Sequence, residues 1–180
     1  MKPYLRVVYN YMKFYWIRLI RRNIDFCPIQ LWGWNTKFVM RHGATVHLGK
    51  HVVSDGRCVV IVDQGADLSI GDGVYFNEGV MISCKDSVKI GSGCKFGPNV
   101  KIFDNDHKFD AVNGVGNEHT SKPISIGKNC WIASNCIVLK GTTIGDNCVI
   151  GAGVVVHGVI PASSMVIASQ DICIKPIKEK

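Results

Sequence analysis

A period of six residues runs through the segment from Ile126 to His157. An aliphatic residue takes the first place of each six, and asparagine or glycine takes the fourth place. The fourth-place residues are Asn129, Asn135, Gly141, Asn147 and Gly153. A period of six matches neither an amphipathic helix nor a half-buried strand. An internal repeat of this kind indicates that the chain stacks similar short units.

The physical meaning of the repeat follows from its turn residues. Asparagine and glycine adopt a positive φ more readily than other residues, so the chain is expected to turn a corner at each fourth place. Three sixes then form one triangular coil of about 18 residues, and successive coils stack at the strand spacing of about 4.8 Å. The aliphatic residues and the small fifth-place residues would face inward. These fifth-place residues are Cys130, Cys136, Thr142, Cys148 and Val154.

This pattern resembles the hexapeptide-repeat acyltransferases, and most closely their sugar, maltose and galactoside O-acetyltransferases and the polysaccharide-biosynthesis acetyltransferases. The resemblance covers about residues 46–165. It implies an all-β fold, a left-handed parallel β-helix. The handedness is implied by the family and not by the spacing.

The repeat is less regular before residue 103. Aliphatic-glycine pairs occur at Leu48-Gly49, Ile70-Gly71 and Ile90-Gly91, at intervals that predict coils with small bulges. The polar segment 103–122 then breaks the pattern, which resumes at Ile124. We therefore expect one protruding loop at 103–122, where function commonly lies in a rigid scaffold.

The expected domain organisation has three parts. Residues 1–45 are predicted to form an N-terminal helix and a capping segment, residues 46–165 the β-helix domain, and residues 166–180 a C-terminal tail. Within the first part, 23–45 is expected to be an irregular connection whose Trp32 and Trp34 cap the open end of the core.

Residues 3–22 combine apolar and aromatic residues with interspersed basic ones and contain no acidic residue. No uncharged apolar run reaches the length of a membrane-spanning helix. Two interpretations stay open. The helix packs on its own β-helix or a neighbouring subunit, or it rests on an anionic membrane surface as a peripheral contact.

Charge and cysteine content restrict the other classes of function. The 180 residues suit one domain, and the net charge of +7 comes largely from six basic residues that precede Asp25. No nucleic-acid-binding motif accompanies this charge, so no nucleic-acid partner is predicted.

Several of the eight cysteines occupy small inward places, and no C-x-x-C motif occurs. Free thiols and the lack of a recognisable secretory signal favour a cytoplasmic protein, with membrane association left open.

His107 is the main catalytic candidate. It ends the stretch FGPNVKIFDNDH, directly after a regular coil. Acyl transfer to a hydroxyl needs a base that removes the proton, and histidine suits this role near neutral pH. The resemblance places the family's catalytic histidine at this position. His119 is the other histidine of the loop and is expected to be exposed.

Acceptor binding is predicted from weaker matches. By resemblance, Asn77 would hydrogen-bond the acceptor sugar. The family's acidic acceptor-binding residue corresponds to Cys84, which is a departure that leaves the acceptor open. Asp104, close to His107, is a further acceptor-binding candidate.

The donor is predicted to be acetyl-CoA, again by resemblance. Trp131 occupies the family's N-x-W-I position and would line the pantetheine arm; the alternative is a subunit contact. Further matched or charged donor-binding candidates are Ser134, Gly151, Ala152, Lys140 and Lys175. The family's A-G-N-P-A stretch is missing from the C-terminal part, so the adenine contacts stay undefined.

A metal site is not predicted. His42, His47 and His51 lie close in sequence, and zinc binds histidine on the β-helix of the carbonic anhydrase family. No set here matches the ligand pattern of that family.

The sequence thus predicts an acetyl-CoA-dependent O-acetyltransferase for a carbohydrate hydroxyl, in surface-glycan biosynthesis. By resemblance it would be a homotrimer with each site between two subunits. An amino-sugar N-acetyltransferase and a non-catalytic β-helix scaffold are the alternatives.

Overall fold

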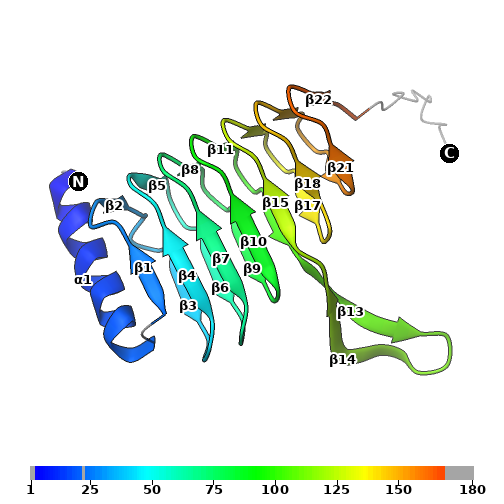
Figure 1. The fold of residues 1–180 in the computed structure, drawn as a ribbon, viewed down its shortest axis with the longest axis horizontal. Coiled ribbons are helices and arrows are strands. Elements are labelled where there is room, and N and C mark those ends of the chain that lie inside the picture. The colour runs from blue at the N-terminus through cyan, green and yellow to red at the C-terminus, as the bar shows by residue number, and fades with distance from the viewer. Residues whose placement is uncertain (1–2, 22, 169–180) are drawn as a thin grey trace, which may run out of the picture.

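The computed structural model describes residues 3–21 and 23–168 as a parallel β-solenoid with one helix at its N-terminal end (Figure 1). Successive coils contribute strands in turn to three parallel sheets, named here A, B and C, with seven, seven and six strands in the described residues. The predicted β-helix fold is confirmed.

The strands of each sheet follow in spatial order. Sheet A contains β1 (Ile24–Phe26), β4 (Thr45–Leu48), β7 (Asp67–Ile70), β10 (Ser87–Ile90), β15 (Ile124–Ile126), β18 (Thr143–Ile144) and β21 (Val159–Ile160). Sheet B contains β2 (Gln30–Leu31), β5 (Val52–Ser54), β8 (Tyr75–Phe76), β11 (Lys95–Phe96), β16 (Trp131–Ile132), β19 (Val149–Ile150) and β22 (Met165–Val166). Sheet C contains β3 (Lys37–Met40), β6 (Val59–Val62), β9 (Met81–Cys84), β12 (Lys101–Phe103), β17 (Ile137–Leu139) and β20 (Val155–Val156).

The corners between the sheets lie where the repeat predicts them. We name them the AB, BC and CA corners after the sheets that they join. The fourth-place residues all have positive φ: 56° at Asn129, 59° at Asn135 and 58° at Asn147, with Gly141 and Gly153 at 75° and 73°. The turn rule inferred from the sequence therefore holds.

The core is a continuous column of inward side chains. All five fifth-place residues between 130 and 154 are buried, at no more than 7% exposure. An aromatic stack continues this column along sheet B, because Trp32 lies 5.5 Å from Phe76 and Phe76 lies 5.0 Å from Phe96, between ring centroids. Stacking thus buries side chains that no single coil could cover.

The irregular early coils keep the predicted register. Leu48 pairs with Ile70, and Ile70 pairs with Ile90. The additional residues lengthen the strands of sheets C and A; β6 and β7 have four residues each, whereas β17 and β18 have three and two. The bulges are thus absorbed on both sides of the CA corner.

The solenoid begins earlier than the repeat predicts. Strands β1, β2 and β3 pair in parallel with β4, β5 and β6, so residues 24–40 form a first coil instead of an irregular connection. Its sequence lacks the period because the polar residues Gln30 and Thr36 are buried in the interior, where later coils carry small apolar residues. Gln30 satisfies its buried amide by donating to the carbonyls of Cys27 and Gly49 and by accepting from Trp32 Nε1.

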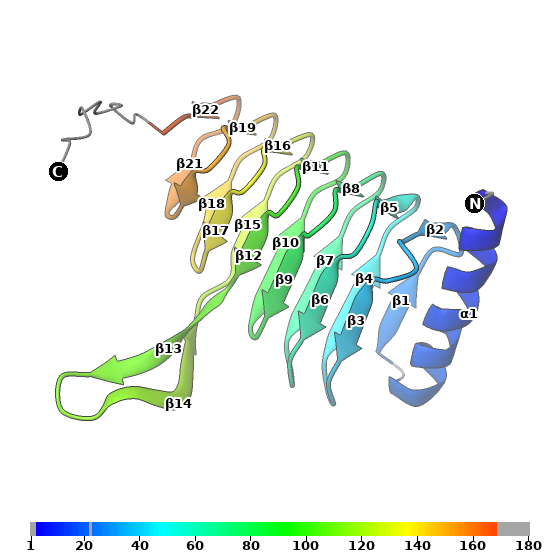
Figure 2. The ribbon, with the colours of Figure 1, turned by 180° about the vertical axis from the view of Figure 1, so that it is seen from behind.

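Helix α1 (Pro3–Arg21) covers the open end of this first coil (Figure 2). Phe14 is fully buried against Phe26, Trp32 and Phe38. Trp32 is therefore buried at the end of the core, whereas Trp34 is 42% exposed and contacts Tyr9 in a tilted arrangement, with ring centroids 4.3 Å apart. Within the described ranges, no helix has the length and apolar character needed to cross a bilayer.

The expected loop is a β-hairpin that projects from the CA corner. Strand β13 (Asn105–Asp110) pairs in antiparallel fashion with β14 (Gly114–Ser121), and both lean away from the solenoid (Figure 1). At the tip, Asp110 Oδ1 accepts from the backbone N–H groups of Val112 and Asn113, and Gly114 has a φ of 68°. This side-chain turn closes the hairpin where sequence analysis expects irregular structure.

Candidate functional site

His107 lies on β13, near the base of the hairpin. Its side chain is exposed and lines a shallow cavity of about 230 Å³ together with Asp106, Thr120 and Lys140. The ring is thus accessible to a small molecule, as a general base must be.

One hydrogen bond determines which ring nitrogen of His107 carries the proton. Nδ1 lies 3.3 Å from the carbonyl oxygen of Gly116 on the opposite strand. A carbonyl can only accept, so the neutral imidazole holds its hydrogen on Nδ1 and donates it there. Nε2 is left with a free lone pair, which is the state that can accept a proton from a hydroxyl.

His119 packs against His107, and the sequence did not predict this contact. It is directly opposite His107 in the hairpin register, and the two ring centroids are 4.2 Å apart. Its pKa is lowered below the ordinary value of 6.5 by desolvation and by the nearby positive charge of Lys85. Two histidines separated by 11 residues around a glycine-containing turn could have signalled a cross-strand pair, had the hairpin been recognised.

Asp104 anchors the base of the hairpin and does not face a ligand. The residue is fully buried, and its carboxylate accepts from the backbone N–H groups of Lys85 and Asp86 and from the side-chain amide of Asn105. The predicted contact between Asp104 and the acceptor sugar is therefore not supported, because the carboxylate is buried and already accepts hydrogen bonds from these three groups of the protein.

Cys84 is likewise buried, with its thiol donating to the carbonyl oxygen of Asp67 at 3.4 Å. Burial and the adjacent Asp104 carboxylate raise the pKa of this thiol. Because its side chain faces the core, the structure does not support acceptor contact by Cys84 either.

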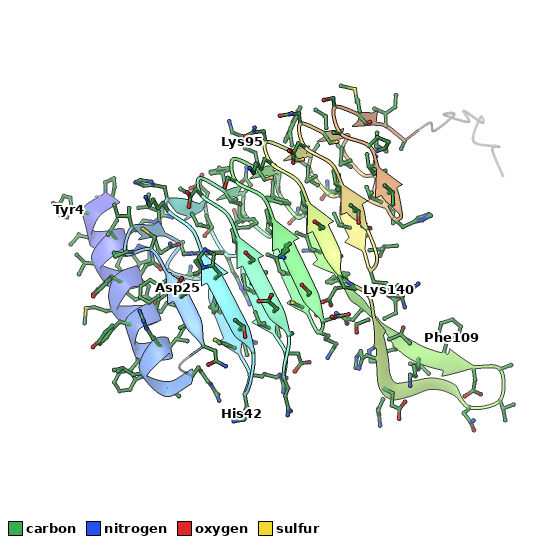
Figure 3. All side chains as sticks on the ribbon, in the orientation of Figure 1. Tyr4, Asp25, His42, Lys95, Phe109 and Lys140 are labelled. Atoms are coloured by element: carbon green, nitrogen blue, oxygen red, sulfur yellow. The ribbon has the colours of Figure 1, made fainter. Side chains whose placement is uncertain are left out.

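Lys140 lies at the CA corner, beside the base of the hairpin (Figure 3). Its Nζ forms an ion pair with Asp106 at 2.8 Å and donates to Thr120 Oγ1 at 2.6 Å. The amine thus ties both hairpin strands to the coil that follows, and its charge is partly neutralised before any phosphate approaches.

The remaining matched positions gather along the BC corner. Consecutive turns stack there: Asn99 N–H donates to Glu78 O, Asn135 N–H to Pro98 O and Gly153 N–H to Ser134 O, each at 2.9 Å. Asn77 precedes the first of these turns and lines a surface cavity of about 360 Å³. Asn77, Ser134, Gly151 and Ala152 therefore share one edge of the solenoid.

Trp131 points outward from sheet B, as the inward placement of its neighbours Cys130 and Ile132 predicts. The indole is 54% exposed, and its strand pairs with Lys95 on one side and Val149 on the other. Because β16 has only two residues, Trp131 lies a short step before Ser134 at the BC corner.

Within one chain, the candidate residues thus form two groups at opposite edges of sheet C. His107 and Lys140 belong to the CA corner, and Asn77, Ser134 and Ala152 belong to the BC corner. Lys175 lies outside the described residues.

The three histidines of the early coils are held apart. His47 faces outward on sheet A and pairs with Asp25, whereas His42 and His51 occupy the CA and AB corners. Across 3–21 and 23–168, no group of three or more His, Cys, Asp or Glu side chains is arranged to hold a metal ion.

A three-sided solenoid built on a six-residue period is typical of hexapeptide-repeat proteins. The family described as "Hexapeptide repeat of succinyl-transferase" matches residues 123–157. Galactoside O-acetyltransferase of Escherichia coli (strain K12) is 37% identical over 102 residues, which are 57% of this chain and 50% of that protein. Nodulation protein L of Rhizobium leguminosarum bv. viciae is 38% identical over 110 residues, or 61% of this chain and 55% of its own.

A solved structure is also similar to this chain. The hexapeptide-repeat-containing acetyltransferase of Vibrio cholerae O1 biovar eltor, complexed with acetyl coenzyme A, aligns with a TM-score of 0.55 and 26% identity. The alignment covers 68% of this chain and 64% of that one. The chain therefore carries a hexapeptide-repeat segment and is similar to hexapeptide-repeat acetyltransferases, and it spans about half the length of the two curated relatives.

Proposed function

We propose that this protein is an acetyl-CoA-dependent O-acetyltransferase that acetylates a carbohydrate hydroxyl in surface-glycan biosynthesis. The observation that carries the proposal is the exposed His107, whose Nδ1–H is held by Gly116 so that Nε2 is free to act as a base. The acetyl-CoA complex of the Vibrio cholerae relative and the galactoside O-acetyltransferase activity in the name of the Escherichia coli relative support the donor and acceptor classes.

In the proposed reaction, Nε2 of His107 removes the proton of the acceptor hydroxyl as its oxygen attacks the thioester carbonyl of acetyl-CoA. The tetrahedral intermediate then collapses, the C–S bond breaks, and the imidazolium returns the proton to the departing thiolate of CoA. Gly116 keeps Nδ1 protonated throughout, so the proton is handled by one nitrogen. The charge that develops on the carbonyl oxygen would be stabilised by backbone N–H groups of a solenoid corner.

The proposed donor site runs along the BC corner. Small residues at Ser134, Gly151 and Ala152 permit a pantetheine arm to approach the backbone, and Trp131 offers an exposed aromatic face beside it. Asn77 at the same edge would hydrogen-bond the acceptor. Lys175 stays a candidate for binding the phosphates of acetyl-CoA. Lys140 is a weaker candidate, because its amine already forms an ion pair with Asp106.

A homotrimer would unite the two groups of residues. One outer row of sheet C contains Val59, Met81 and Ile137, with Lys101 between the last two. The corresponding outer row of sheet A is polar and contains His47, Ser69 and Lys89. If sheet C faces a three-fold axis parallel to the solenoid, the CA corner of one copy meets the BC corner of the next. His107 of one copy would then approach Asn77 and the donor edge of its neighbour.

The test is the release of free thiol from acetyl-CoA in the presence of a panel of sugars, with identification of the product by mass spectrometry. We expect His107→Ala to lower kcat/KM by about 10²–10⁴-fold, the usual contribution of a general base. The matched control is His42→Ala, which removes an exposed histidine from an early coil and should keep the native rate.

Three results would reject parts of the proposal. Full activity of His107→Ala would remove His107 from the mechanism. Amide products formed on amino sugars would point to an N-acetyltransferase. A folded protein that neither binds nor turns over acetyl-CoA would favour a scaffold.

A further inference from the structure

Helix α1 directs three polar or basic side chains, Arg6, Asn10 and Lys13, toward the solenoid. Asn10 is fully buried and donates to the carbonyl oxygen of Trp32, and Lys13 donates to the carbonyl oxygen of Thr36. The guanidinium of Arg6 donates to the carbonyls of Leu31 and Ser54. The polar groups that a surface helix usually shows to water are therefore used to cap the first coil.

The opposite face of α1 is apolar and exposed. Successive steps of three or four residues place five large apolar side chains on it, which we call the outer stripe: Leu5, Val8, Met12, Trp16 and Leu19. Their exposed fractions run from 47% for Leu5 to 67% for Met12. Tyr11 and Tyr15 flank the stripe and stack on each other with ring centroids 6.0 Å apart. A contiguous exposed patch of this kind marks an interaction site.

The charges around the outer stripe select its partner. Residues 3–21 contain no carboxylate, and Arg18 and Arg21 are exposed in the last turn. Two outer stripes packed together would bring basic groups near each other with no acid on the helix to pair with them. An anionic lipid surface instead complements the arginines, accepts the aliphatic side chains among its acyl chains, and suits tryptophan and tyrosine at the headgroup level.

We propose that the outer stripe of α1 is a peripheral docking surface for an anionic lipid bilayer. The helix would lie in the plane of the headgroups, with the solenoid standing away from the membrane. Because α1 covers one end of the solenoid, docking leaves the corners and the hairpin in solution (Figures 1 and 2).

The position of α1 at one end of the solenoid also suits the proposed trimer. Only the following argument about several contacts rests on that trimer. A three-fold axis parallel to the solenoids places three outer stripes at the same end of the assembly. Three individually weak contacts to one surface then act together and bind far more tightly than one.

The test is sedimentation of the full chain with vesicles made of equal parts phosphatidylcholine and phosphatidylserine, compared with vesicles of phosphatidylcholine alone. We expect binding to the anionic vesicles that weakens with added salt. The double variant Met12→Gln/Trp16→Gln should lower the partition coefficient at least about tenfold, because both side chains are exposed and lose their apolar insertion. The matched control is Val159→Gln, which alters a 75% exposed valine near the other end of the solenoid and should bind like the native chain.

Three outcomes would overturn the proposal. Native protein could stay in the supernatant with anionic vesicles, or the double variant could bind as well as the native chain. The third is a double variant whose mass in light scattering falls to a fraction of the native mass, which would identify the outer stripe as a contact between copies. Vesicle binding is measured without acetyl-CoA, so a failure of the proposed catalysis leaves this result independent.

Discussion

At the scale of single residues, the hairpin joins a candidate base to a second histidine and a buried carboxylate. His107 keeps its Nε2 free because Gly116 accepts from Nδ1, and His119 packs on the same ring. Asp104 fixes the point where the hairpin leaves the coil. His119 and Asp104 each lead to a testable prediction in which the residue does not bind the substrate.

His119 should titrate below pH 6.5 in the folded protein, because desolvation and Lys85 disfavour its charged form. A folded-state pKa below the unfolded value means that its contribution to stability is complete above pH 6.5 and is lost as the pH falls through the folded pKa. Histidine ring resonances followed by NMR would give the midpoint. Lys85→Gln should raise this midpoint and Lys89→Gln should leave it unchanged; a native midpoint at or above 6.5 would contradict the assignment.

Asp104→Asn should destabilise the protein by about 1–3 kcal/mol, because an amide NH2 would replace an acceptor among three donors. Urea unfolding measures this loss. Asp106→Asn is the control in the same hairpin; its surface ion pair with Lys140 is worth at most about 1 kcal/mol. Equal effects of the two variants would show that Asp104 is not the anchor.

At the scale of the elements, the coils depend on two different kinds of glycine. Gly73 has a φ of 65°, and a Cβ built there meets nothing within 4 Å. Gly91 has an ordinary φ, but its Cβ would lie 2.6 Å from the backbone of Gly127 in the next coil. The first glycine permits a turn, and the second permits neighbouring coils to approach.

This distinction predicts that the AB corner tolerates substitution of the first glycine and is destabilised by substitution of the second. Gly73→Asn should change the free energy of unfolding by no more than about 0.5 kcal/mol, since asparagine holds positive φ at Asn129 and Asn147. Gly91→Ala should cost about 1–3 kcal/mol or more, because the added methyl group forces two coils apart. Thermal or urea unfolding of both variants decides the matter; a tolerated Gly91→Ala would show that the coils adjust freely.

At the scale of the whole molecule, the candidate residues lie at two edges of sheet C, and the proposed trimer would bring them together in one site. The proposed trimer makes the outer face of sheet C its contact. This arrangement would cover the outward apolar side chains of Val59, Met81 and Ile137.

Ile137→Glu should therefore convert the assembly from three chains to one, since a buried carboxylate without a partner opposes the contact. Light scattering gives the mass, and thiol release should fall in parallel because each site would lose its second half. Thr143→Glu, on the outer face of sheet A, is the control and should keep both the native mass and the activity. A native protein that is already a single chain would reject the trimer.

Much of this protein was determined by local sequence. The corners at Asn129, Asn135 and Asn147, the inward cysteines and the outward Trp131 follow from the six-residue period, because the turn preference and side-chain direction are short-range properties. Tertiary structure alone decided the rest. The first coil at 24–40 is held by pairing with its neighbour despite an aperiodic sequence, and cross-strand pairing placed His119 on His107. Stacking of unequal coils buried Asp104 and Cys84 and put His107 and Asn77 at different corners, because these positions depend on contacts between residues far apart in the chain.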